Sequence, residues 1–208
     1  MKPISLSQQA YEIIKQKIIS LALPPGTVID AAVLREELGV GRTPIREALQ
    51  RLAQEKLVLI VPRRGMFVTE IAITDLQKLY EARLVFEPFA ARQAAKRGTT
   101  AHWAKMAAAL AQGDDATNEQ LIAIDEQCHQ IIYEAADNQF LKETLTMMYA
   151  LSLRLWYYAL AQIGNMQDAV MEHRLIMDAL VAHDGAEAER LMANHIRTFQ
   201  EEFQTVML

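Results

Sequence analysis

The chain has 208 residues, 51% of them hydrophobic, and a formal net charge of −5. This length and apolar fraction suffice for one or two folded domains and exclude a disordered chain. No apolar run approaches the roughly 18 residues of a transmembrane helix, and the N-terminal segment lacks the apolar block of a signal peptide. We therefore expect a cytoplasmic protein without a membrane partner. The single cysteine, Cys128, excludes an internal disulfide and a multi-cysteine zinc site.

Charge is unevenly distributed along the chain. Residues 1–70 contain ten Lys and Arg against seven Asp and Glu, a net of +3, whereas residues 71–208 contain 11 against 19, a net of −8. The charge of a segment bears on its binding partners more directly than the total does. The sequence thus predicts a small basic N-terminal domain and a larger acidic domain.

Two helices are predicted at the start of the basic domain. The first has apolar residues at helical spacing, begins after Ser7 as its N-cap and ends before the Pro-Pro-Gly sequence at 24–26. The second, at 30–38, is short and begins with Asp30 as its N-cap. A turn is then predicted at Gly-Val-Gly, residues 39–41.

A third helix is predicted after this turn, with Thr43 as its N-cap and Pro44 at the first helical position. Arg42 and Arg46 lie at its N-terminal end, on the side that faces away from the apolar residues. The helix dipole makes this end positive, so both arginines add to a site suited to anions.

A basic β-hairpin is predicted directly after the third helix. The strand-like runs at 57–61 and 66–70 are joined by Pro-Arg-Arg-Gly, which places Arg63 and Arg64 at the tip. Helix, turn, helix and basic wing together predict a winged helix-turn-helix that binds double-stranded DNA, with arginines on guanine edges or phosphates. Each arginine taken alone could instead be an ordinary solvated residue.

The stretch LREELGVGRTPIREALQRLAQEKLVLIVPRRGMFV resembles the DNA-binding domain of the GntR superfamily of bacterial transcription regulators. The resemblance implies that Gly65 lets the wing backbone approach the minor groove. Gly41 stands where that family has serine, so a hydroxyl that could touch phosphate is absent. The predicted DNA-binding residues of domain 1–70 are Arg35, Arg42, Thr43, Arg46, Arg63, Arg64 and Gly65.

Residues 74–208 show no strand alternation and few helix breakers, so we expect an all-helical domain for ligand binding and dimerisation. Thr74 is the expected cap of its first helix, and Pro88 can kink that helix. The whole chain is therefore predicted to be mainly α. Six helices are expected in this domain, within residues 74–98, 100–115, 116–137, 138–165, 166–183 and 186–204.

One carboxylate and three imidazoles of this domain can converge. Asp125 and His129 are four residues apart and share a helix face. His173 and His195 are equidistant from a turn at 184–185, so two antiparallel helices would place them at one height. If the helices pack together, the set suits Zn²⁺, Ni²⁺ or Mn²⁺, with positions left for water or a ligand carboxylate. Each histidine taken singly could instead be an ordinary hydrogen-bonded residue.

The sequences DEQCHQIIYEAADNQFL and EHRLIMDALVAHDGAEAERLMANHI resemble the C-terminal effector domain of the FadR subfamily, the FCD domain. In many members of that family an aspartate and three histidines bind a metal, and a small organic acid coordinates it. The resemblance implies a divalent transition metal, Zn²⁺ with Ni²⁺ or Mn²⁺ as alternatives. Its ligands would be Asp125, His129, His173 and His195.

A carboxylate effector calls for a second anchor, and arginine binds carboxylates bidentately. Arg83 matches a common arginine of the family, and Arg154 lies in an otherwise apolar stretch, so both are predicted to bind the effector. Arg83 could instead pair with Glu87 one turn on, and Arg154 could extend to the surface.

These features predict a ligand-responsive transcription repressor, not an enzyme. A homodimer on a palindromic operator is expected, because two N-terminal domains related by a twofold axis make twice as many base contacts as one. Ligand at the metal would repack the helical domain and alter operator affinity. Two alternatives stay open. One is a metal-free regulator of a larger apolar ligand, and the other is a metal-dependent hydrolase, for which no adjacent general base is evident.

Overall fold

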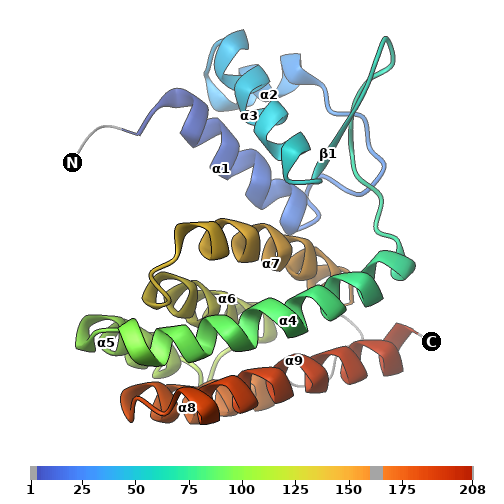
Figure 1. Cartoon of the computed structure of the whole chain (residues 1–208). Coiled ribbons are helices and arrows are strands. Elements are labelled where there is room, and N and C mark those ends of the chain that lie inside the picture. The colour runs from blue at the N-terminus through green and yellow to red at the C-terminus, as the bar shows by residue number, and fades with distance from the viewer. Residues whose placement is uncertain (1–3, 160–165, 208) are drawn as a thin grey trace. The chain divides into compact units, whose positions relative to one another are not determined.

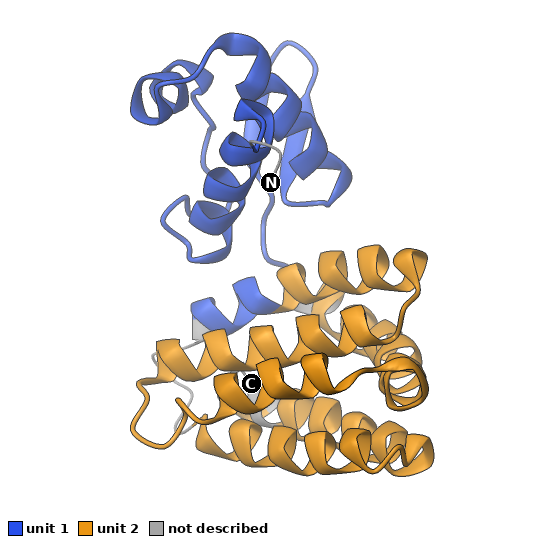
Figure 2. Ribbon diagram, turned by 90° about the vertical axis from the view of Figure 1, so that its left-hand side faces the viewer, with its two compact units in different colours: residues 1–73, 153–158 blue, residues 74–152, 159–208 orange. Residues whose placement is uncertain are grey.

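The computed structural model describes residues 4–159 and 166–207, which are mainly helical with one two-stranded sheet (Figure 1). The chain divides into two compact units, which Figure 2 colours separately. The first comprises residues 1–73 with 153–158, and the second residues 74–152 with 159–208. Among the described residues, none of the helices has the length and apolar character needed to cross a bilayer.

The N-terminal part of the first unit is a three-helix cluster with a hairpin. Helix α1 packs against α3, and side chains such as Ile14, Ile18 and Leu49 are fully buried. The predicted winged helix-turn-helix arrangement is confirmed. Its elements are α1 (Leu6–Ile19), α2 (Ala31–Leu38), α3 (Arg42–Gln54), β1 (Val58–Val61) and β2 (Gly65–Val68).

The first two helix caps show where local sequence was sufficient and where it was not. Asp30 caps α2 as predicted, because its side chain accepts the backbone N–H of Ala32 at 2.7 Å. Helix α1 instead begins earlier than predicted, with Ser5 as N-cap and Ser7 inside the first turn. Both serines suit a cap chemically, and the extended backbone of Ser5 decides between them.

The start of α3 also differs from the prediction. The helix begins at Arg42, and Gly41 occupies the N-cap position without a side-chain hydrogen bond. Thr43 is therefore a first-turn residue and not the cap. Pro44 at the third helical position is still tolerated, because backbone N–H groups in the first turn have no intrahelical acceptor.

The wing is an antiparallel hairpin in which Val58 pairs with Val68 and Val61 with Gly65. Its turn uses left-handed backbone, with φ of 63° at Arg63 and 113° at Gly65. A bridge from Val28 to Phe67 ties the hairpin to the segment before α2.

The second unit contains helices throughout its described residues, which confirms the all-helical prediction. The predicted cap Thr74 is wrong, because α4 begins at Ile73 and Thr74 is already a helical residue, and α4 continues through Pro88 without a break. The predicted helix end at 165 lies outside the described residues. The elements are α4 (Ile73–Arg97), α5 (Thr100–Leu110), α6 (Asn118–Ala135), α7 (Gln139–Ala159), α8 (Gln167–Val181) and α9 (Gly185–Met207), of which Leu153–Tyr158 of α7 belong to the first unit.

Helices α8 and α9 form the hairpin expected around residues 184–185. Asp184 caps α9 by accepting the backbone N–H groups of Ala186 and Glu187 at 3.1 and 3.0 Å. Helix α6 packs against α8, so the buried side of α6 faces the hairpin. The packing of these three helices positions the polar cluster described below.

Candidate nucleic-acid interface and metal centre

The N-terminal end of α3 lines an open hollow at the surface of the first unit. Arg35 of α2 lines it together with Arg42, Thr43 and Arg46 of α3. Arg42, Thr43 and Arg46 are exposed, whereas the Nε atom of Arg35 is buried without an acceptor. A buried donor without a partner costs free energy, and a phosphate oxygen could supply its acceptor.

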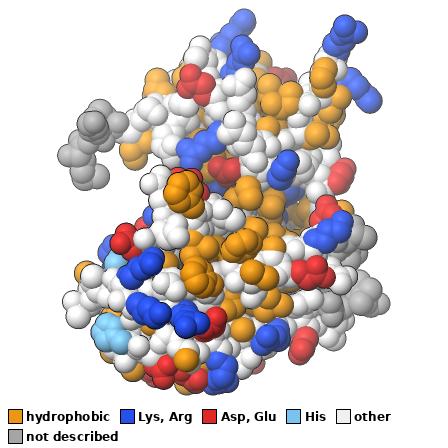
Figure 3. Space-filling view, in the orientation of Figure 1, with side chains coloured by type: hydrophobic (Ala, Val, Ile, Leu, Met, Phe, Trp, Pro, Cys, Tyr) orange, Lys and Arg blue, Asp and Glu red, His pale blue; other side chains and the backbone are white. Residues whose placement is uncertain are grey.

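The arginines at the start of α3 and at the tip of the wing are available to an external anion. Within the described part of the chain, no ion pair involves Arg42, Arg46, Arg63 or Arg64. Figure 3 shows Lys and Arg side chains at the start of α3 and at the tip of the wing. Unpaired arginines at a helix N-terminus and on a hairpin tip are suited to the phosphates of a duplex.

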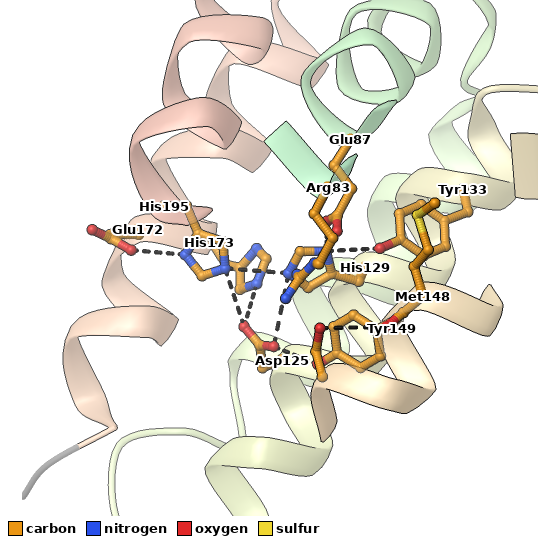
Figure 4. Close-up of polar contacts among 11 residues, drawn as sticks. Arg83, Glu87, Asp125, His129, Tyr133, Met148, Tyr149, Glu172, His173 and His195 are labelled. Atoms are coloured by element: carbon orange, nitrogen blue, oxygen red, sulfur yellow. Dashed lines mark hydrogen bonds and ion pairs between the residues drawn. The ribbon is translucent and has the colours of Figure 1, made fainter. Parts of the chain in front are cut away.

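Four residues of the second unit converge in its interior, as their spacing predicts. Asp125 and His129 come from α6, His173 from α8 and His195 from α9, and all four are buried. One ligand atom from each lies within 4.8 Å of the others. Figure 4 shows the three imidazoles and the carboxylate directed at one another.

The three histidines present their Nε2 atoms to this cluster. Asp125 Oδ1 lies 2.7 Å from Nε2 of His173 and 3.4 Å from Nε2 of His195. Nε2 of His129 lies 3.2 Å from Nε2 of His195. Three imidazole nitrogens and a carboxylate are the donor set of Zn²⁺, Ni²⁺ and Mn²⁺ sites.

Carboxylates stand behind two of these imidazoles. Nδ1 of His129 lies 2.7 Å from Glu87 Oε2, and Nδ1 of His195 lies 2.7 Å from Glu172 Oε2. Carboxylates behind metal-binding histidines fix the ring orientation and strengthen the coordinating nitrogen. Of these two contacts, the one between Glu172 and His195 is a hydrogen bond. Oε2 of Glu87 and Nδ1 of His173 are both buried without a hydrogen-bond partner. The residues present therefore fit a metal ion bound through the Nε2 atoms.

The electrostatics of the cluster favour cations. Burial alone would raise the pKa of Asp125, but the neighbouring histidines hold it well below its ordinary value. Burial together with the charge of His195 lowers the pKa of His173 to about 4. Burial would also lower the pKa of His195, yet hydrogen bonds to Asp125 and Glu172 raise it to about 9. At neutral pH, Asp125 is therefore ionised and His173 neutral, as metal binding requires, whereas His195 carries a proton that a metal ion must displace.

Arg83 and two tyrosines complete the surroundings of the cluster. Tyr149 donates its hydroxyl to Asp125 Oδ2 at 2.5 Å, and Tyr133 Oη lies 3.3 Å from Nδ1 of His129. The guanidinium of Arg83 is buried, pairs with Glu87 and lies 5.3 Å from the centroid of the Tyr149 ring. Figure 4 shows Arg83 and Glu87 beside His129.

Comparison with known families assigns both parts of the chain. Residues 6–68 match the family described as bacterial regulatory proteins, gntR family, and residues 78–198 match the FCD domain. The chain belongs to the GntR family. Regulators of this family bind operator DNA and typically act as dimers. They are transcription regulators and not enzymes, so the hydrolase alternative is set aside.

This GntR-family chain is similar to named regulators over most of its length. It is 27% identical to the HTH-type transcriptional repressor RspR of Escherichia coli K12, covering 97% of this chain and 90% of RspR. It is 25% identical to the HTH-type transcriptional repressor GlaR of the same organism, over 92% and 93% of the two chains. The solved structure of E. coli McbR/YncC shares the fold, with a TM-score of 0.86 at 22% identity over 98% and 99% of the chains.

The structure brings Arg83 to the cluster but not Arg154. Arg154 donates to the hydroxyl and the carbonyl oxygen of Thr69, at 2.8 and 2.7 Å, and both residues belong to the first unit. These bonds occupy donors that the prediction assigned to an effector carboxylate. Burial lowers the pKa of Arg154 to about 10, partly offset by the charge of Glu70.

Sequence reasoning gave no site role to four residues that the structure places at the cluster, Glu87, Tyr133, Tyr149 and Glu172. Glu87 was considered only as a partner of Arg83. Glu172 carried a usable signal, because it and His195 are nearly equidistant from the turn at 184–185. Tyr149 carried none, since its helix approaches Asp125 only through tertiary packing.

Proposed function

We propose that this GntR-family protein is a repressor whose FCD domain binds a divalent transition metal and a small carboxylate effector. The observation that carries the proposal is the convergence of four buried ligand atoms within 4.8 Å. Zn²⁺ fits this set of three imidazoles and one carboxylate, and Ni²⁺ and Mn²⁺ are alternatives.

The residues divide the work of such a site. Asp125, His129, His173 and His195 would hold the ion, and Glu87 and Glu172 orient two of the imidazoles. The bound ion would supply a Lewis-acidic centre for an effector carboxylate. Arg83, buried beside His129, is the proposed second anchor for that carboxylate.

The first unit is proposed to bind operator DNA through Arg35, Arg42, Thr43, Arg46, Arg63, Arg64 and Gly65. The exposed end of α3 suits the major groove, and the wing suits the adjacent backbone. A repressor acts on chromosomal DNA, so we place the protein in the cytoplasm. The effector is proposed to alter operator affinity by shifting the equilibrium between conformations of the FCD domain.

A second copy of the chain is the proposed partner of α4. Val85, Phe86 and Phe89 are exposed on this helix, and Figure 3 shows apolar side chains gathered over it. Regulators of the GntR family typically act as dimers. Two winged helix-turn-helix domains on a palindromic operator bind more tightly than one, which favours a homodimer.

Metal analysis of the purified protein tests the metal centre. We expect one bound ion per chain, and its loss in His173→Ala. The matched control is His183→Ala, because His183 is exposed and its Nδ1 contacts a backbone carbonyl of α4 instead of the cluster. Circular dichroism verifies that both variants fold. Wild-type protein that takes up no stoichiometric metal would overturn the proposal in favour of a metal-free regulator.

Operator binding at several salt concentrations tests the DNA-binding face. Arg46→Ala should weaken binding and, if Arg46 contacts phosphate, lower the salt slope by about one. The control is Arg190→Ala, which removes an exposed arginine that pairs with Glu187 in the second unit. Equal operator affinity of the two variants would contradict the assignment of this face.

A further inference from the structure

Glu87 contacts both the buried guanidinium of Arg83 and His129 of the proposed metal centre. Its side chain has no exposed surface, and it occupies α4 one turn after Arg83. Its Oε1 pairs with Nε of Arg83, while its Oε2 lies 2.7 Å from Nδ1 of His129. One carboxylate is therefore shared between the proposed effector anchor and a proposed metal ligand.

Glu172, the carboxylate beside Nδ1 of His195, is not shared with a cation in this way. Glu172 lies at the same 2.7 Å from Nδ1 of His195, but its side chain is 29% exposed. Within the described residues, no Lys or Arg forms an ion pair with Glu172. The two carboxylates thus lie at the same distance from a histidine Nδ1 and differ in two respects. Glu172 Oε2 is hydrogen-bonded to His195 whereas Glu87 Oε2 has no hydrogen-bond partner, and only Glu87 is paired with a cation.

The carboxylate of Glu87 is close to both partners in the interior of the unit. The guanidinium of Arg83 faces one of its oxygens and the imidazole of His129 the other. Interactions between charges are strong at a site with no solvent exposure. Whatever neutralises Arg83 therefore changes the field that His129 experiences.

We propose that Glu87 couples anion capture at Arg83 to cation capture by Asp125, His129, His173 and His195. This inference rests on the proposed function, because it requires the cluster to bind metal. While Arg83 is paired only with Glu87, the guanidinium offsets the carboxylate charge. When an effector carboxylate shares Arg83, more of that charge acts on the Nδ1–H of His129, and Nε2 becomes a stronger donor. By linkage, bound metal raises the affinity for the anion by the same factor.

A double-mutant cycle tests this coupling with Zn²⁺ alone as the probe. Arg83→Met removes the cation, as a bound anion would neutralise it, and should tighten Zn²⁺ binding roughly tenfold. Glu87→Gln should weaken it about 10- to 100-fold, as loss of a carboxylate behind a ligand does. In the double variant, Arg83→Met should no longer increase the affinity for Zn²⁺. Dissociation constants are measured by competition with a chelator.

Glu172→Gln is the matched control. It should also weaken Zn²⁺ binding, because it removes the charge of the carboxylate that is hydrogen-bonded to Nδ1 of His195. The gain from Arg83→Met should persist in the Glu172→Gln background. If the gain is the same in both glutamine backgrounds, Arg83 acts on the ion directly and the coupling role of Glu87 is overturned.

Arg83→Met leaves a buried carboxylate without its cation, so folding is checked by circular dichroism. If that variant does not fold, Arg83→Lys replaces it in all three backgrounds. Lysine keeps the charge on a more mobile chain without the guanidinium Nε, so a smaller gain is expected, again absent with Glu87→Gln. Wild-type protein that binds no Zn²⁺ would refute the metal-binding function itself. If the wild-type protein binds Zn²⁺ but the effects of Arg83→Met and Glu87→Gln on Zn²⁺ affinity are additive, only the coupling is refuted.

Discussion

Gly41 illustrates at the scale of one residue how the start of α3 differs from the family pattern. It holds the N-cap position with extended backbone, φ −71° and ψ 176°, and no side chain completes the cap. A Cβ atom at this position would meet only Cδ of Pro44, at 3.8 Å. Serine therefore fits here without strain, and its hydroxyl could accept a first-turn N–H or contact a phosphate.

We predict that Gly41→Ser raises the free energy of unfolding by about 0.3 kcal/mol, because serine caps slightly better than glycine. Operator binding should tighten severalfold if the hydroxyl reaches a phosphate. Urea unfolding and fluorescence anisotropy with labelled operator measure the two effects. Gly41→Ala is the control, since it adds Cβ without a hydroxyl, and equal behaviour of the two variants would refute the prediction.

The spacing of the proposed metal ligands was visible in the sequence, whereas the carboxylate behind His129 was not predictable. Asp125 and His129 share a face of α6 because they are four residues apart, and this spacing is visible in the sequence. Glu87 reaches His129 from another helix, 42 positions earlier in the chain. Nothing in the local sequence of α4 or α6 specifies that these two helices approach one another at this point.

The wing shows strain at the scale of an element. Arg63 adopts left-handed backbone with φ 63°, which costs a non-glycine residue roughly 1 kcal/mol or more. The same residue places an exposed cation at the hairpin tip. The proposed DNA-binding role of Arg63 would account for an arginine at a position where glycine would be more stable.

We predict opposite effects of Arg63→Gly on stability and on DNA binding. The free energy of unfolding should rise by up to about 1 kcal/mol, because glycine adopts positive φ without penalty. Operator affinity should fall at low salt, because a cation is lost. Arg64→Ala provides the comparison, since Arg64 is not among the residues with positive φ and its loss should weaken binding without added stability. Unchanged operator affinity in both variants would exclude a role for the wing.

Helix hairpins were more predictable than helix boundaries. Placing a turn at residues 184–185 correctly paired His173 with His195, because antiparallel helices bring equidistant positions to one height. The start of α3 was predicted wrongly at Thr43, since Gly41 can adopt the cap backbone and local chemistry favoured the hydroxyl. Cap positions depend on how the preceding turn redirects the chain, which residue type alone does not specify.

At the scale of the whole molecule, the apolar surface of α4 is the feature that a single chain leaves unexplained. Val85 is 66% exposed, and Phe86 and Phe89 lie on the same helix and are also exposed. A contiguous apolar surface in contact with water is typical of an interaction site. A second copy of the chain is the partner that we propose, because regulators of the GntR family typically act as dimers.

Val85→Asp should therefore shift the protein from dimer to monomer, as measured by light scattering after size-exclusion chromatography. Burying an unpaired charge in an apolar interface is costly, so a shift of at least tenfold in dimer dissociation is expected, roughly 1.4 kcal/mol. Operator affinity should fall in parallel. Val181→Asp is the matched control, because Val181 of α8 is 52% exposed and should remain dimeric when replaced. Dimers in both variants would direct the search to another surface.

The sequence by itself determined the helical character, the basic winged helix-turn-helix, and the two pairs Asp125/His129 and His173/His195. These features follow from periodicity, turn chemistry and spacing along one helix or one hairpin, which are local properties of the chain. That the two pairs meet depends on the packing of α6 against α8. The tertiary structure alone decided that Glu87 and Tyr149 lie at the cluster and that Arg154 binds Thr69 instead. Such contacts join elements far apart in the chain, and only the packing of one helix on another determines which side chains meet.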